Sequence, residues 1–124
     1  MQAPLAGLRV VEFTHMVMGP ACGLALADLG ADVIKVEPAA SDGRPGGDNT
    51  RRLKGAGTGF FAMLNRNKRS FAADMKSAEG LAQVKALLRT ADVLIENFRP
   101  GALDRLGLSY EALRAENERL IYCS

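Results

Sequence analysis

The chain has 124 residues, of which 48% are hydrophobic and 24% are charged, and its formal net charge is +2. This length and composition fit one globular unit and exclude the disordered, fibrous and membrane-embedded classes of protein. The small net charge gives no general attraction to nucleic acid, so we expect no nucleic-acid partner, and any anion site has to come from a local cluster.

The start of the chain and its two cysteines indicate a cytoplasmic protein. The segment MQAPLAGLRVVEF lacks a charged stretch followed by a long apolar one, and eighteen apolar residues never run together, so we expect neither a signal peptide nor a membrane span. Cys22 and Cys123 match no zinc spacing and are too few for a disulfide framework. We therefore expect no metal site and two reduced thiols that pack as small hydrophobes.

The first half of the chain predicts a strand, a helix and a second strand. Residues 8–13 (LRVVEF) are rich in β-branched side chains, and residues 32–37 (DVIKVE) repeat this pattern, which is typical of buried strands. Residues 19–29 between them are small and apolar and end at Gly30, a common residue after a helix. The next stretch of about twenty residues is crowded with Gly, Pro, Asp and Ser, so we expect this loop to be the least structured part of the chain.

The second half of the chain continues the alternation of strands and helices. Ser77 is expected to cap a helix with apolar residues at helical spacing. The predicted elements are a helical turn at 60–64, strands at 70–74, 92–96 and 119–123, helices at 77–90 and 109–117, and a short helix at 102–106. This order predicts an α/β fold with one Rossmann-like, open and mostly parallel sheet. Because the last strand is apolar and no closing segment follows it, we expect an incomplete domain.

Ligands of open α/β sheets bind outside the carboxyl ends of the strands, so the loops after the first, second and fourth strands are expected to meet at one rim. The first of these loops, THMVMGP, lacks the G-x-G-x-x-G pattern, and the G-x-x-x-x-G-K-[ST] pattern is absent from the chain. These absences argue against nicotinamide, flavin and ordinary P-loop sites. We interpret His15, in the same loop, as a rim residue.

Two clusters of cations are candidate anion sites. Arg51, Arg52 and Lys54 form the first cluster. The second cluster consists of Arg66, Lys68 and Arg69. Each is consistent with phosphate binding through charge-assisted hydrogen bonds or with solvated loop charge, and the sequence leaves both readings open.

Other candidates follow the third and fourth strands. Met75 suits packing on a flat ring or filling of the core, and Lys76 suits neutralisation of a phosphate. Asn97 and Phe98 suit recognition of a polar group on a flat ligand. Arg105 lies one short helical turn further along the chain, and it either reaches the same rim or is a surface residue.

A family resemblance rests on several motifs in chain order. The chain resembles the start of family III (CaiB/BaiF) CoA-transferases, especially formyl-CoA:oxalate-type members, in the segments GLRVVEFTHMVMGPACGLALADLGADVIKVEP, NRNKRSFAADMK and DVLIENFRPGALDRLGLSYEALRAENERLIYCS. The similarity spans almost the whole chain, and its motifs are specific only in combination.

The resemblance implies an enzyme that moves CoA from an acyl-CoA thioester to a small carboxylic acid through an aspartyl mixed anhydride. CoA and acyl-CoA are then substrates, and no tightly bound cofactor is expected. The nucleophilic aspartate of the family lies beyond Ser124, so this chain is expected to contain no catalytic residue and to be inactive alone. The family also forms interlocked homodimers, which we expect of the complete protein.

The resemblance further implies that this chain supplies part of the CoA site. The residues that it assigns to CoA binding are Met16, Met18, Met75, Lys76, Asn97, Phe98, Arg105 and Leu106. Two positions depart from formyl-CoA:oxalate-type members, because an active-site glutamine is matched by Val17 and an arginine beside the nucleotide by Pro38. Oxalate specificity is therefore not implied.

Two other functions remain open from the sequence. An α-methylacyl-CoA racemase shares the fold family and similar N-terminal motifs, although ENFRPGALDRLGL favours the transferases. A non-enzymatic fragment that binds nucleotide at most is the second alternative.

Overall fold

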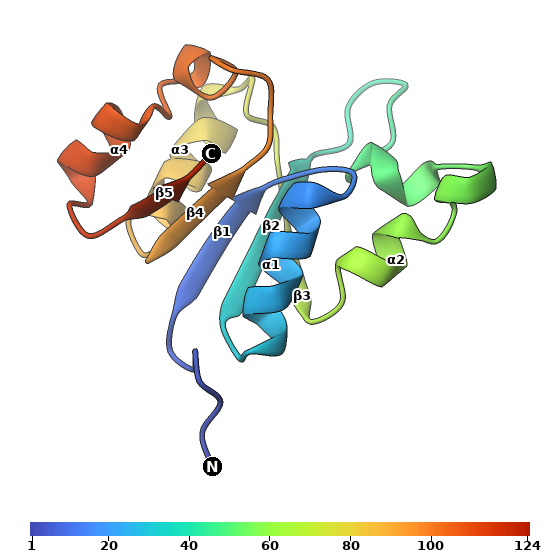
Figure 1. Cartoon of the computed structure of the whole chain (residues 1–124). Coiled ribbons are helices and arrows are strands. Elements are labelled where there is room, and N and C mark those ends of the chain that lie inside the picture. Colours follow the sequence, from blue (N-terminus) through green and yellow to red (C-terminus); the bar gives the residue numbers. More distant parts are fainter.

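The computed structural model describes residues 1–124, which form one five-stranded, all-parallel sheet (Figure 1). The strand order is β3-β2-β1-β4-β5. The strands are β1 (Arg9–Phe13), β2 (Asp32–Pro38), β3 (Lys68–Ala73), β4 (Val93–Glu96) and β5 (Ile121–Cys123). The predicted α/β fold with an open parallel sheet is confirmed, and all five strands lie within two residues of their predicted bounds.

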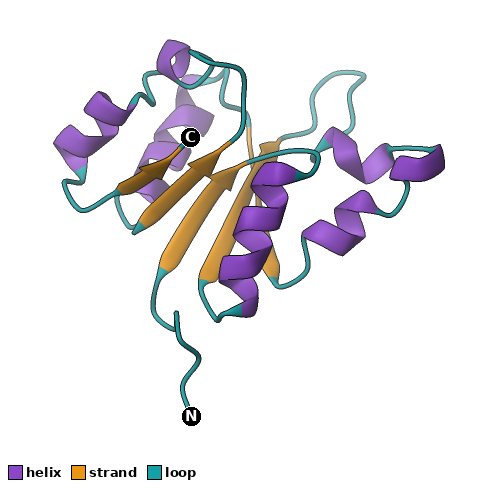
Figure 2. Cartoon of the chain, in the orientation of Figure 1, coloured by secondary structure: helices purple, strands orange, loops and turns teal.

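Helices cover both faces of the sheet, as Figure 2 shows. The helices are α1 (Met18–Asp28), α2 (Phe60–Leu64), α3 (Ala78–Leu88) and α4 (Tyr110–Glu116). Right-handed crossovers place α1 and α2 on one face and α3 and α4 on the other, because the chain moves along the sheet in opposite directions in its two halves. All four helices coincide with predicted ones to within two residues, and a 3-10 turn, η3 (Asp104–Leu106), falls within the predicted short helix.

The larger part of the core lies between the sheet and α3 and α4. Twelve buried residues form this cluster, including Val11 and Leu94 of the sheet, Leu88 of α3 and Leu113 of α4. A smaller cluster of five buried residues lies on the α1 side, around Val10 and Val33. Ser77 and Ser109 cap α3 and α4 by accepting hydrogen bonds from backbone N–H groups three residues on.

Two glycines of α1 face β1 and allow the helix to approach the strand closely. A Cβ atom on Gly23 would stand 1.8 Å from Oε2 of Glu12, and one on Gly19 would stand 2.6 Å from Cγ2 of Thr14. Only a residue without a side chain fits at either position. The sequence GPACG therefore sets how closely the first helix approaches the carboxyl end of β1.

The loop between β2 and α2 has more structure than the sequence predicts. Residues Ser41 and Arg44 close a tight turn through two backbone hydrogen bonds, and two 3-10 turns follow, η1 (Asn49–Arg52) and η2 (Gly55–Gly57). The Asp48 side chain caps η1 by accepting a hydrogen bond from Thr50 N at 2.8 Å. The expectation that this is the least structured part of the chain is wrong, because its polar residues bond to one another and to the sheet.

The expectation that both cysteines pack as small hydrophobes is also wrong, because both are exposed. Cys123 lies on the edge strand β5, where Ile121 is also exposed, and Cys22 lies on α1. None of the helices combines the length and the apolar character that a membrane crossing requires.

Candidate functional site

Loops at the carboxyl edge of the sheet enclose two neighbouring cavities. The larger, here called the cationic cavity, has a volume of about 540 Å³. It is lined by Pro38, Ala39, Ser41, Arg44, Pro45, Gly47, Asn49, Arg52, Ala73, Asp74, Met75, Lys76 and Leu106. The loops after β2 and β3 and the η3 turn thus meet at this edge.

The smaller cavity, here called the His15 cavity, has a volume of about 210 Å³. Its lining comes from the loops after β1, β2 and β4 and consists of Thr14, His15, Met16, Val36, Pro38, Asp48, Asn49, Thr50, Leu53 and Phe98. Pro38 and Asn49 line both cavities, so the two spaces adjoin. The predicted convergence of the loops after the first, second and fourth strands is confirmed.

Five of the predicted CoA-binding residues line these cavities. Met75, Lys76 and Leu106 line the cationic cavity, and Met16 and Phe98 line the His15 cavity. Met75 is only partly buried and packs against the edge of the core. Its position is therefore compatible with both predicted roles, packing on a flat ring and filling the core.

The other three predicted residues lie elsewhere. Met18 is 80% exposed at the start of α1, and Arg105 is exposed on η3; neither lines one of the two cavities. Asn97 instead clamps the loop after β1: its Oδ1 accepts a hydrogen bond from His15 N at 3.0 Å and its Nδ2 donates to His15 O at 2.9 Å. Asn97 therefore shapes the rim.

His15 is held at the rim by its neighbours. Its ring lies 5.6 Å from the ring of Phe98, which in turn packs edge-on against the buried Phe13. The next residue, Met16, has a φ of 62°, a left-handed backbone conformation that is uncommon for a residue with a side chain. A hydrogen bond from Met16 N to Thr50 Oγ1 at 3.0 Å supports it and joins the first loop to η1.

Most of the two predicted cation clusters is engaged within the protein. Arg66 pairs with Asp28, and Arg69 with Asp32, which lowers the pKa of both carboxyl groups through hydrogen bonds from the guanidinium groups. Lys68 is buried beside α1 and is not a loop charge. Arg66, Lys68 and Arg69 therefore form ion pairs within the protein. This role differs from both alternatives that the sequence leaves open, phosphate binding and solvated loop charge. Arg52 is the member of these clusters that lines the cationic cavity.

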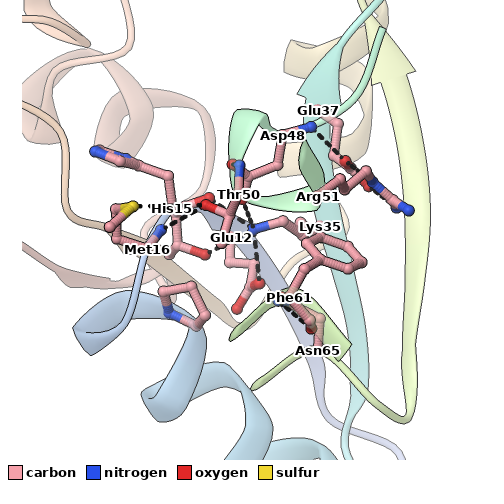
Figure 3. A network of polar contacts seen from close by, with 12 residues as sticks. Glu12, His15, Met16, Lys35, Glu37, Asp48, Thr50, Arg51, Phe61 and Asn65 are labelled. Atoms are coloured by element: carbon pink, nitrogen blue, oxygen red, sulfur yellow. Dashed lines mark hydrogen bonds and ion pairs between the residues drawn. The ribbon is translucent and has the colours of Figure 1, made fainter. Parts of the chain in front are cut away.

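A buried network of charges lies beneath the loops, and sequence reasoning missed it (Figure 3). Lys35, 2% exposed, lies between Glu12 and Asp48, with its Nζ 3.0 Å from Asp48 Oδ2 and 3.7 Å from Glu12 Oε1. The same Nζ donates to Thr14 O at 2.6 Å. One lysine thus ties β1, β2 and the loop after β2 together.

Lys68 extends this network into β3. Its Nζ donates to Glu12 Oε1 at 2.8 Å, to Pro20 O at 2.8 Å and to Asn65 Oδ1 at 3.0 Å. Burial lowers the pKa of Lys68, and the hydrogen bond to Glu12 opposes but does not cancel this effect. Strand β3 and helix α1 are therefore joined through a buried charge pair.

Glu37 anchors η1 to the end of β2. Its carboxylate accepts hydrogen bonds from Asp48 N at 2.7 Å, from Arg51 Nε and Nη2 at 2.8 and 2.7 Å, and from Ser70 Oγ at 2.7 Å. Burial alone would raise the pKa of Glu37, but the hydrogen bonds led by Arg51 outweigh it and lower this pKa to about 2. The Arg51 guanidinium also stacks on Phe61, 3.9 Å from the ring centroid.

The chemistry of the edge suits an anion with an apolar part. The charged side chains of the cationic cavity are Arg44, Arg52, Lys76 and Asp74, three cations and one carboxylate. Met75 and Leu106 supply apolar surface beside them. No group of three or more His, Cys, Asp and Glu side chains is arranged to hold a metal ion.

Comparison with known proteins identifies relatives over the whole chain. The chain is 46% identical over 131 residues to the succinate–glutarate CoA-transferase of Agrobacterium fabrum, covering 98% of this chain and 32% of the relative. It is 46% identical over 129 residues to the formyl-CoA:oxalate CoA-transferase of Rhodopseudomonas palustris, covering all of this chain and 29% of the relative. The chain thus spans about a third of the length of these relatives.

Solved structures give the same relationship. A CaiB/BaiF family protein from Brucella suis superposes with a TM-score of 0.86 at 45% identity, covering 100% of this chain and 33% of that one. The protein Rv3272 from Mycobacterium tuberculosis superposes with a TM-score of 0.87 at 41% identity, covering 98% and 33%. Residues 5–124 also match the family described as CoA-transferase family III. Because its sequence and its fold both match those of this family over nearly its full length, the chain belongs to CoA-transferase family III.

Proposed function

We propose that the complete protein to which this chain belongs transfers CoA from an acyl-CoA thioester to a carboxylic acid, and that residues 1–124 supply part of the CoA site. The observation that carries the proposal is the cationic cavity, because a family III chain presents Lys76 and two arginines there beside apolar surface. The nucleotide end of CoA combines several phosphates with a flat adenine base, so a lining of cations beside apolar surface suits it.

The proposed chemistry uses an aspartate beyond Ser124. Its carboxylate attacks the thioester carbonyl, the C–S bond breaks, and CoA leaves as the thiolate while a mixed anhydride forms on the enzyme. Backbone N–H groups would stabilise the negative charge on the attacked oxygen. We assign no aspartate of this chain as nucleophile: Asp28 and Asp32 are in ion pairs, and Asp48 belongs to the buried network.

We also propose a cellular location, an oligomeric state and substrates for the complete protein. We infer that residues 1–124 form the N-terminal, CoA-binding part of a cytoplasmic enzyme that works as an interlocked homodimer on acyl-CoA and a small carboxylic acid. The names of the relatives suggest succinate, glutarate, formate and oxalate as the first acids to test.

The test is an acyl-exchange assay on the complete protein. The protein is incubated with succinyl-CoA or formyl-CoA and each acceptor acid, and the new thioester is separated by chromatography. We expect a new acyl-CoA that requires both the enzyme and the acceptor acid. The racemase alternative predicts instead that a 2-methylacyl-CoA exchanges its α-hydrogen with deuterated water without any acceptor. That exchange in the absence of acyl transfer would overturn the proposed reaction.

A further inference from the structure

We propose that Arg44 is a phosphate-binding residue that acts together with Lys76 in the cationic cavity, an inference that rests on the proposed CoA site. Arg44 belongs to the loop after β2, which projects from the edge where the strand arrows end in Figure 1, and Lys76 lies three residues after the end of β3. Both residues line the same cavity, so the loops after two neighbouring strands both contribute cations to it.

The two cations are free to bind a ligand. The Arg44 guanidinium and the Lys76 ammonium make no ion pair or hydrogen bond within the protein, whereas Arg51 and Arg69 are each committed to a carboxylate. An unpaired cation in a cavity keeps all its donors for an incoming anion, and a guanidinium presents them in a fork that matches two phosphate oxygens. Lys54, an exposed cation without an ion-pair partner, does not line this cavity.

The backbone that carries Arg44 is fixed before any ligand arrives. Arg44 N donates to Ser41 O at 2.8 Å, and Ser41 N donates to Arg44 O at 3.2 Å. Gly47 N donates to Pro38 O at 2.8 Å, which closes the loop onto the end of β2. Such a preformed loop loses little conformational entropy on binding.

Arg52 strengthens the same arrangement from the other end of the loop. Its guanidinium donates to Gly46 O at 2.9 Å and to Asn49 Oδ1 at 2.9 Å, so it holds the loop and adds positive charge without a carboxylate partner. The only carboxylate in the lining, Asp74, already accepts a hydrogen bond from Lys76 N at 3.0 Å. The balance of charge therefore favours a phosphate over a neutral or cationic group.

The experiment measures CoA affinity of the complete protein by calorimetry for the wild type and for Arg44→Ala, Arg44→Lys and Lys76→Ala. Arg119→Ala is the matched control, because Arg119 is an exposed arginine two residues before β5, the edge strand opposite β3. We expect Arg44→Ala and Lys76→Ala each to weaken CoA binding by roughly tenfold or more, as for loss of a charge-assisted hydrogen bond. Arg44→Lys should recover part of the loss, and Arg119→Ala should bind as the wild type does.

A second series of measurements with dephospho-CoA, which lacks the 3′-phosphate, shows which phosphate of CoA Arg44 contacts. If Arg44→Ala weakens both ligands equally, Arg44 contacts the diphosphate; if the loss disappears with dephospho-CoA, it contacts the 3′-phosphate. Wild-type affinity in Arg44→Ala, or an equal loss in Arg119→Ala, would overturn the role of Arg44 and leave the proposed CoA site standing. A wild-type protein that does not bind CoA would overturn the proposed site itself and this inference with it.

Discussion

Glu37 shows how one buried carboxylate can order the loops at the carboxyl edge of a sheet. It is 2% exposed, yet it accepts four hydrogen bonds, two of them from the Arg51 guanidinium. Its pKa falls from the usual 4.5 to about 2 because these donors outweigh the effect of burial. A carboxyl group with a lowered pKa in the folded state stabilises the fold when ionised, so its contribution is complete above pH 4.5 and is lost as the pH falls toward about 2.

We therefore expect Glu37→Gln to lower the free energy of unfolding of the chain at pH 7 by on the order of 3 kcal/mol. The amide cannot accept the same set of charged and neutral donors. Urea unfolding at pH 7 and at pH 3 measures the effect, and the gap between wild type and variant should shrink at the lower pH. Glu118→Gln, which changes an exposed glutamate without a partner, is the control and should stay within about 0.5 kcal/mol of the wild type. A gap that is independent of pH would contradict the assigned pKa of Glu37.

At the scale of elements, the buried lysine of β2 links pieces that are distant in sequence. Lys35 contacts Thr14 after β1 and Asp48 at the start of η1, and Lys68 of β3 reaches the same Glu12. Removing one member of a buried ion pair leaves a charge without compensation, which is more damaging than removing both members.

Lys35→Met keeps the length of the side chain and removes its charge, so we expect a loss of about 3 to 5 kcal/mol in the free energy of unfolding. Lys54→Met is the matched control, because Lys54 is exposed and unpaired, and it should change stability by less than about 0.5 kcal/mol. Chemical denaturation of both variants is the measurement. Equal stability of the two variants would show that the network does not stabilise the fold.

The elements were predictable from sequence, whereas this network was not. Strand and helix patterns are local, so runs such as LRVVEF and a serine before a helical repeat locate their elements to within two residues. Lys35 and Glu37 lie in a strand that was recognised by its β-branched residues alone, and their partners Asp48 and Arg51 come from a loop whose composition suggested little structure. Sequence motifs placed Met75, Lys76 and Leu106 at the cationic cavity, but Arg44 lies in none of these motifs and its place follows only from the folded loop.

At the scale of the whole molecule, the chain contains a cavity suited to a nucleotide. It spans only about a third of the length of its relatives. We therefore expect this chain to retain CoA binding but to lack acyl-transfer activity. The cations of the cationic cavity all lie within residues 44–76, while the proposed nucleophile lies beyond Ser124.

We expect residues 1–124 to bind CoA more weakly than the complete protein and to show no acyl exchange. The affinity should fall because residues outside this chain would complete the proposed site, and exchange should be absent because no residue of this chain replaces the proposed nucleophile. Calorimetry with CoA and chromatography of an incubation with succinyl-CoA and glutarate measure the two properties on one preparation, with the complete protein as the positive control. Exchange above the enzyme-free rate by residues 1–124 would place the nucleophile within this chain and contradict its assignment downstream.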